Sequence, residues 1–336
     1  MTNSGNVGTN HIVIKRTVEI SSRPAHLSSR HQQLVIQPHD EDRSAETTIP
    51  CEDIGLLLVD HPQVTITHRA MSDLAEAGAA VVVCGRNHLP AGIMLPLSTH
   101  HAVNQRFRLQ VGATAPANKR IWQQLVRAKI RGQAGNLVTD DADVQAAAKR
   151  LQRLADTTAS GDPANHEAQA ATAYWKVFLR GLPAAEASEP QVPPGRFRRD
   201  QDGGDPVNAA LNYGYTVMRA AVGRAIVAAG FTPVFGVMHS HRANAFALAD
   251  DLIEPLRPLV DARVQQLYAR GDLADGLKQN NKARLLDLLT HPVVTHGRTG
   301  PLMVALHSLT ASLAEAYETT GAELAIPVWK RVRACR

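Results

Sequence analysis

The sequence changes its hydrophobic pattern once, and that change limits the fold to a sheet-containing part followed by a helical part. Up to residue 110, short runs rich in Val, Ile and Leu alternate with Pro, Asp, Gly and Ser, which is typical of β-strands. One helix is expected among them, over 68–77, because Thr67 is a good N-cap and Gly78 ends the run. The strands are expected at 11–16, 33–37, 55–60, 63–67 and 80–84.

Beyond residue 110, apolar residues recur at helical spacing. Gly, Pro and small residues at 109–120 separate the two patterns. We therefore expect an α+β chain, with a small β-sandwich-like N-terminal domain over 1–110 and a larger, all-helical domain over 111–336. A chain of 336 residues is long enough for each domain to bury a core. The proline-rich segment 182–207 is expected to be a long loop.

An acidic line marks one of the expected helices, which Asn244 would cap. At about 100° per residue, Asp250, Glu254 and Asp261 fall on one face, and leucine and isoleucine side chains occupy the opposite face. Carboxylates held close together repel one another unless a cation or protonation relieves them. His239 lies in a turn just before this helix. Because acidic helix faces are usually solvated, this stretch alone favours a solvated face over a metal site.

A second carboxylate, Glu167, interrupts an apolar stripe. Asp162 is a good N-cap and Pro163 suits the first helical position, so a helix is expected from there. On that helix Glu167 lies in line with Tyr174 and Phe178. An unpaired carboxylate in such a stripe costs free energy, so Glu167 is expected to meet a metal, another cation or a strong hydrogen-bond donor. The alternative is a glutamate favoured near a helix start by the macrodipole.

Another helix is expected over 121–137, with a basic side. Its inward positions are Ile121, Leu125, Ala128 and Ile130. The outward positions are Arg120, Arg127, Lys129 and Arg131. Further lysines and arginines lie on the next expected helix, at Lys149, Arg150 and Arg153. Such clusters suit the neutralisation of nucleic-acid phosphates, although no single cluster proves DNA binding.

Charge and cysteine usage narrow the class of protein. Residues 1–110 carry a formal net charge of −1 and residues 111–336 one of +6. A locally acidic pocket inside a basic half suits a polyanionic substrate placed over a metal. The three cysteines lie far apart and indicate reduced thiols in a cytoplasmic protein. We find neither a signal-like segment nor a run of about 20 apolar residues, so no membrane association is expected.

Several stretches taken together resemble the CRISPR spacer-acquisition integrase, the first of the two universal CRISPR adaptation proteins. They are IPCEDIGLLLVDHPQVTITH (49–68), GRNHLPAGIMLPL (85–97), WQQLVRAKIRGQA (122–134), GDPANHEAQAATAYW (161–175), NAALNYGYTVMRA (208–220) and GVMHSHRANAFALADDLIEPLRPLVD (236–261). The sequences of these segments are similar to those of the type II branch of the family, of the II-C kind. The fold of that family, a small β-sandwich-like domain followed by a larger helical catalytic domain, agrees with the division made above.

The resemblance implies a divalent ion, Mg²⁺ or Mn²⁺, held by a glutamate, a histidine and a second acidic residue. In this sequence they are Glu167 of the GDPANHEAQAA motif, His239 of the GVMH motif and Glu254 of the DLIEPLRP motif. The same three residues are implied to be catalytic. Neighbouring side chains are further candidates for assisting the metal, namely Asp250, Asp251 and His241.

The implied reaction is a metal-dependent transesterification. A 3′-hydroxyl of captured double-stranded DNA attacks a phosphodiester at the edge of a CRISPR repeat, and with water as the nucleophile the same site becomes an endonuclease. The implied assembly has two integrase homodimers flanking one dimer of the small second adaptation protein, with the N-terminal domain used for dimerisation and DNA contact. The effector nuclease of type II systems is a further candidate partner. The alternatives are a non-catalytic DNA-binding scaffold and a metal hydrolase of small phosphoesters or RNA.

Overall fold

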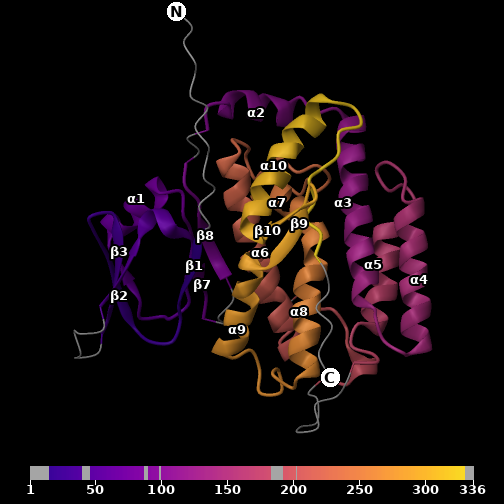
Figure 1. Ribbon diagram of the computed structural model, residues 1–336, viewed down its shortest axis with the longest axis horizontal. Helices are drawn as coiled ribbons and strands as arrows, with labels where there is room; N and C mark the ends of the chain where they lie inside the picture. The colour runs from indigo at the N-terminus through magenta and orange to yellow at the C-terminus, as the bar shows by residue number, and fades with distance from the viewer. Residues whose placement is uncertain are drawn as a thin grey trace, which may run out of the picture.

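The computed structural model describes residues 15–39, 46–86, 90–97, 100–182, 192–201 and 203–329. Sheets from the N-terminal part lie on one side of the molecule, and helices make up most of the other side (Figure 1). Much of the expected strand at 11–16 and part of the loop 182–207 fall outside these ranges, as does Cys335.

The N-terminal part contains two four-stranded sheets. The first has the order β1 (Arg16–Ile20), β5 (Ile54–Val59), β7 (Ala80–Cys84) and β8 (Pro90–Met94). Its first three strands are parallel and β8 is antiparallel to β7. The second has the order β4 (Thr47–Pro50), β3 (Gln33–Pro38), β2 (Ala25–Arg30) and β6 (Thr65–Ile66).

Strand β5 is buried on both faces, as expected for a central parallel strand made of a continuous apolar run. Ile54 and Leu57 share a small core with the second sheet and with α1 (His68–Glu76). Leu56 and Leu58 belong to the large core of the helical part. Helix α1 begins where the sequence predicts, because the Thr67 side chain accepts a hydrogen bond from the N–H of Ala70 at 3.2 Å.

The helical part is built around α6, which is buried along nearly all of its length. Helices α7 to α10 pack against it, whereas α3, α4 and α5 form a neighbouring group (Figure 1). The helices are α2 (Val103–Val111), α3 (Ala115–Asn136), α4 (Ala142–Thr157), α5 (His166–Val177), α6 (Pro206–Ala228), α7 (Ala247–Ile253), α8 (Arg257–Ala269), α9 (Gln279–Leu286) and α10 (Leu302–Glu318). In the described part of the chain, no helix combines the length and the apolar character needed to cross a bilayer.

The α+β class is confirmed, but the expectation of an all-helical second part is wrong. A hairpin of β9 (Pro292–Thr295) and β10 (Arg298–Pro301) lies among the helices. Its turn has positive φ at His296 and Gly297, the backbone form that matches the twist of a hairpin. The sequence does not predict these strands, since four-residue strands are too short to show a clear alternation. Helical structure also starts ahead of residue 110, with α2.

Candidate active site

Two of the three predicted site residues meet at one buried cation, the ammonium group of Lys129. Its Nζ lies 2.6 Å from Oε1 of Glu167 and 2.5 Å from Oε2 of Glu254. The three side chains come from α3, from the first turn of α5 and from the turn that follows α7. Segments far apart in the sequence thus bring two carboxylates to the same point.

The loop before α5 positions Glu167. Asp162 and Asn165 both have positive φ, so the backbone cannot be helical there and α5 begins at His166 rather than at Pro163. The capping carboxylate is nevertheless Asp162, which accepts hydrogen bonds from the N–H groups of His166 and Glu167 at 2.8 and 2.9 Å. Glu167 therefore starts the helix with its side chain facing α3, where it finds the expected cation.

A proline shapes the backbone at Glu254. The helix expected after an Asn244 cap and through Asp261 begins only at Ala247. It is interrupted by a 3₁₀ turn over Glu254–Leu256, in which Pro255 cannot donate a backbone hydrogen bond. The buried carboxylate also accepts a hydrogen bond from Nε of Arg257 at 2.9 Å. Burial by itself would raise the pKa of Glu254, but the charges of Lys129 and Arg257 outweigh it and lower that pKa.

The third predicted residue, His239, is held by Asp251. Its Nδ1 lies 2.5 Å from Oδ1 of Asp251, and its ring meets Trp122 edge to face at 5.8 Å. The hydrogen bond to Asp251 raises the pKa of His239 against the opposing effect of burial. The charges of Glu254 and Asp250 also raise the pKa of His239.

Asp251 is fixed by the backbone that carries the histidine. It accepts hydrogen bonds from the N–H groups of Val237, Met238 and His239 at 2.5, 2.9 and 3.3 Å. This approach requires Gly236, because a Cβ there would lie 2.4 Å from the carbonyl oxygen of His239 and 2.8 Å from Oδ2 of Asp251. The aspartate is fully buried and closed to solvent. Through its contact with Nδ1 it orients the imidazole.

The other acidic residues of the predicted line have partners of their own. Asp250 pairs with Arg219 at 2.5 Å and accepts a hydrogen bond from the amide of Asn244 at 2.8 Å. Asp261 accepts a hydrogen bond from the hydroxyl of Tyr215. His241 is exposed and lies in a turn. The three carboxylates of one helix face are therefore buried rather than solvated, yet they do not converge.

The expectation that Lys129 faces water is wrong. Only 11% of its side chain is exposed, and it lies on the inward stripe of α3 with Leu125, Val126 and Ile130. Its spacing of four residues from Leu125 and three from Val126 puts it on the same helix face as these apolar residues, which is the signal for burial that the sequence contains. The argument that singled out Glu167 in an apolar stripe applies equally to this residue. Arg257, three residues after Glu254, was also missed.

The donor chemistry fits a divalent ion, although the groups are not assembled around one point. Two carboxylates and an imidazole suit Mg²⁺ or Mn²⁺. Because Asp251 engages Nδ1, Nε2 is the ring nitrogen through which His239 could bind a metal. Within the described ranges, however, no three His, Cys, Asp or Glu side chains stand ready to hold a metal ion. Lys129 instead takes one oxygen from each glutamate.

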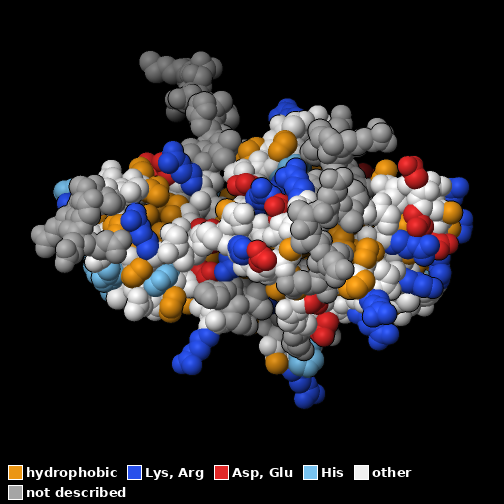
Figure 2. All heavy atoms as spheres, turned by 90° about the horizontal axis from the view of Figure 1, so that it is seen from below, with side chains coloured by type: hydrophobic (Ala, Val, Ile, Leu, Met, Phe, Trp, Pro, Cys, Tyr) orange, Lys and Arg blue, Asp and Glu red, His pale blue; other side chains and the backbone are white. Residues whose placement is uncertain are grey.

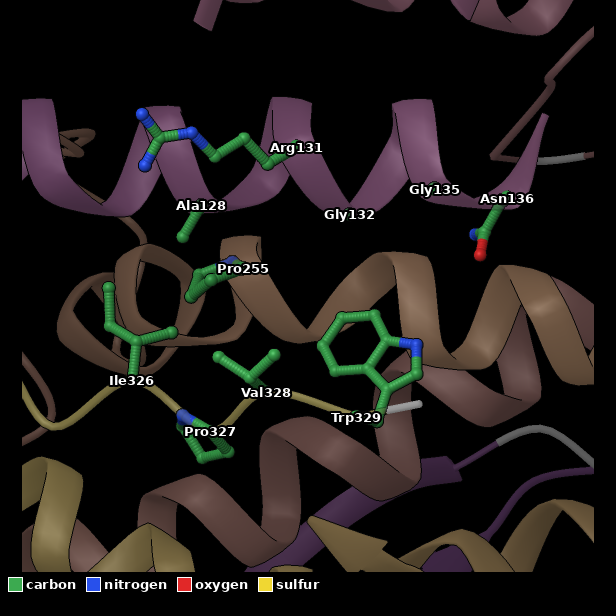
Figure 3. A pocket seen from close by; sticks show the side chains of 10 residues that line it. All are labelled: Ala128, Arg131, Gly132, Gly135, Asn136, Pro255, Ile326, Pro327, Val328 and Trp329. Atoms are coloured by element: carbon green, nitrogen blue, oxygen red, sulfur yellow. The ribbon is translucent and has the colours of Figure 1, made fainter. Parts of the chain in front are cut away.

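Two cavities are lined by residues other than the predicted site residues. One, of about 320 Å³, lies between α3 and the C-terminal segment, and Figure 3 shows Pro255, Val328 and Trp329 on the side facing Gly132 of α3. It is mainly apolar and contains none of the predicted site residues. The other, of about 480 Å³, lies in the N-terminal part and is lined by His31, Glu52, Asp73 and Glu76 among others. Neither cavity is the predicted reaction site.

Basic side chains gather at one end of the molecule. Lys149, Arg150 and Arg153 on α4 are exposed. Figure 2 shows Lys and Arg side chains collected at the end of the molecule where α4 lies. A polyanion could therefore be held close to the group of helices that includes α3 and α5.

Comparisons with known proteins bear on the family and the fold of the chain. The model of the family described as CRISPR associated protein Cas1 matches residues 18–294. The chain is 36% identical over 286 residues to the CRISPR-associated endonuclease Cas1 of Neisseria meningitidis serogroup C, covering 85% of this chain and 87% of that protein. A solved structure of a casposase bound to integration product has a similar fold, with a TM-score of 0.73, 19% identity and 95% of each chain covered. A Cas6-RT-Cas1–Cas2 complex matches with a TM-score of 0.72 and 21% identity, over 99% of this chain and 37% of that one.

Proposed function

Since the chain belongs to the family of CRISPR-associated Cas1 proteins, we propose that it is a metal-dependent DNA integrase and endonuclease of CRISPR adaptation. It joins the 3′-hydroxyl ends of captured double-stranded DNA to a CRISPR repeat by transesterification. The observation that carries the proposal is the meeting of Glu167 and Glu254 at one buried cation beside an oriented histidine. A relative named as an endonuclease and a structural neighbour bound to an integration product favour this function over a non-catalytic scaffold.

In this proposal Glu167, Glu254 and His239 are the catalytic residues and hold Mg²⁺ or Mn²⁺. The bound ion would neutralise the phosphate oxygens and promote deprotonation of the attacking hydroxyl. Asp251 fixes the ring of His239 so that Nε2 is presented, and Arg257 orients the carboxylate of Glu254. The exposed Lys and Arg side chains of α4 hold the DNA backbone without reading its sequence.

The proposed partners are double-stranded DNA, a second copy of this chain and the small second adaptation protein. Two homodimers would flank one dimer of that protein. A structural neighbour belongs to a Cas6-RT-Cas1–Cas2 complex, which supports association with such a second protein. The same proposal includes a sandwich-like packing of the two N-terminal sheets and the use of that domain for dimerisation. It also includes the type II-C assignment and a contact with the effector nuclease.

A strand-joining assay tests the proposal. The protein is mixed with its small adaptation partner, Mn²⁺, a labelled duplex with free 3′-hydroxyls and a supercoiled plasmid carrying a repeat. We expect wild type to transfer label, and Glu167→Gln and His239→Ala to fall to background while still binding duplex. His241→Ala is the matched control from the same loop and should retain transfer, because that ring is exposed and accepts a hydrogen bond from the N–H of Ala243 in its own turn. Transfer by Glu167→Gln would refute the site, and tight DNA binding without transfer by any form would favour a scaffold.

A further inference from the structure

We propose that Lys129 is an internal counter-ion that holds Glu167 and Glu254 together without a metal and competes with the divalent ion for them. The inference rests on the proposed metal site and goes beyond it, because it assigns a role to a residue outside the ligand set. It also concerns when the site takes up its ion rather than which groups bind it.

The contacts of Lys129 support this role. Its Nζ bridges the two carboxylates at 2.6 and 2.5 Å, and only 11% of the side chain is exposed. The oxygens that it touches, Oε1 of Glu167 and Oε2 of Glu254, belong to the two predicted acidic ligands. Its ammonium neutralises two carboxylates that would otherwise repel each other.

The charge balance explains the competition. Glu167 and Glu254 contribute two negative charges, and Lys129 and Arg257 contribute two positive charges at contact distance. The cluster is thus neutral before any ion arrives. A divalent ion added beside both cations would leave two uncompensated positive charges in a largely buried place, which is costly. The ion is therefore expected to bind when the flexible lysine stem withdraws its ammonium from the shared carboxylates.

The inference predicts that removing the ammonium tightens metal binding. We would measure Mn²⁺ binding by electron paramagnetic resonance in full-length, chelator-treated protein without DNA. Lys129→Met should bind Mn²⁺ at least about tenfold more tightly than wild type, because one repelling charge is lost. Lys149→Met removes an equal charge from an exposed position on α4 and should stay within about twofold of wild type.

Thermal unfolding supplies a second readout that does not depend on activity. In chelator, Lys129→Met should unfold at a lower temperature than wild type, because Glu167 and Glu254 then face each other without the ammonium. Added Mn²⁺ should raise its melting temperature more than that of wild type, since a ligand that binds only the folded state stabilises it. Lys129→Gln keeps a hydrogen-bond donor at the position and decides the outcome if the methionine variant does not fold in chelator.

Glu167→Gln separates failure of this inference from failure of the proposed function. If Glu167→Gln loses Mn²⁺ binding while neither Lys129 variant binds more tightly than wild type, the metal site stands and the counter-ion role is refuted. If Glu167→Gln binds Mn²⁺ as wild type does, the proposed metal site itself is refuted, and the role of Lys129 falls with it.

Discussion

Two buried lysines in this chain have the same chemistry but different surroundings. Lys282 of α9 lies 2.5 Å from Asp60, which follows β5, and both side chains are at most 7% exposed. Lys129 of α3 lies between two glutamates, and the side chain of one of them, Glu167, is 28% exposed. The first pair joins the N-terminal sheet to the helical part, and the second group joins helices within the helical part.

The difference lies in how many partners each ammonium has and whether water reaches them. Lys282 and Asp60 form a closed ion pair that is shielded from water, with the ring of Tyr213 5.6 Å from the ammonium and the Cys84 thiol hydrogen-bonded to Asp60. Burial there also raises the pKa of the neighbouring Cys84 thiol to about 12, as expected for a place that disfavours charge. Lys129 has two acidic partners, one of them partly open to solvent, which is the arrangement that the proposed exchange of one cation for another requires. We therefore assign stability to the first lysine and function to the second.

Breaking the closed pair should have the largest effect on stability. We expect Lys282→Met to lower the free energy of unfolding by about 3–5 kcal/mol, because Asp60 is left as a buried charge without its ammonium. Denaturant unfolding monitored by circular dichroism measures this. Added Mn²⁺ should stabilise Lys282→Met no more than it stabilises wild type, in contrast to its effect on the Lys129 variants.

A double variant provides the control for that prediction. Replacing both partners with apolar residues, as in Asp60→Leu with Lys282→Met, should recover most of the lost free energy, because no buried charge then remains. A double variant as unstable as the single one would mean that the pair contributes through its geometry rather than through charge compensation.

The partners of the two lysines differ in how far the sequence predicts them. Glu167 was recognised because a carboxylate interrupts an apolar stripe of its own helix, and Lys129 could have been found in the same way. The pairing of Lys282 with Asp60 joins residues 222 positions apart, and no local pattern indicates it. The hydrophobic pattern predicts β3, β5, β6, β7 and most of the helices, but not the strands β2, β4, β8, β9 and β10. The start of α5 depends on the left-handed backbone at Asp162 and Asn165, which periodicity does not reveal.

The acidic line on the helix illustrates the same limit. The sequence placed Asp250, Glu254 and Asp261 on one face, and the structure buries all three. What could not be predicted is which partner each would meet, because Arg219, Lys129 and Tyr215 come from other helices. Periodicity identifies a face, but the chemistry of that face depends on contacts distant in sequence.

Asp261 extends the comparison to a buried carboxylate without a lysine partner. Burial raises its pKa from the ordinary 3.8 to about 7, although hydrogen bonds from Tyr215 and Tyr174 oppose this. Between these values the folded state binds more protons than the unfolded state, so stability should fall as the pH rises. We expect wild type to lose about 2–3 kcal/mol more than Asp261→Asn between pH 5 and pH 8.

Denaturant unfolding of both proteins at several pH values measures that difference. Other groups that titrate in the same range are present in both chains, so their contributions cancel in the comparison. Parallel stability curves for wild type and Asp261→Asn would mean that Asp261 is already ionised at pH 5. A positive charge such as that of Arg257 would then control it more strongly than burial does.

An exposed ion pair gives the smallest expected effect on stability. It tests whether the effects of the two lysines come from their burial rather than from charge pairing as such. Arg131 and Asp156 lie 3.1 Å apart, with side chains 59% and 67% exposed. Water screens such a pair and both side chains lose freedom when they meet, so Arg131→Ala should change the free energy of unfolding by less than about 0.5 kcal/mol. Arg131 lies two residues from Lys129 on α3. If Arg131→Ala lost as much stability as Lys282→Met, disturbing this helix would itself be destabilising. The effects of the Lys129 variants could then not be assigned to its two carboxylates.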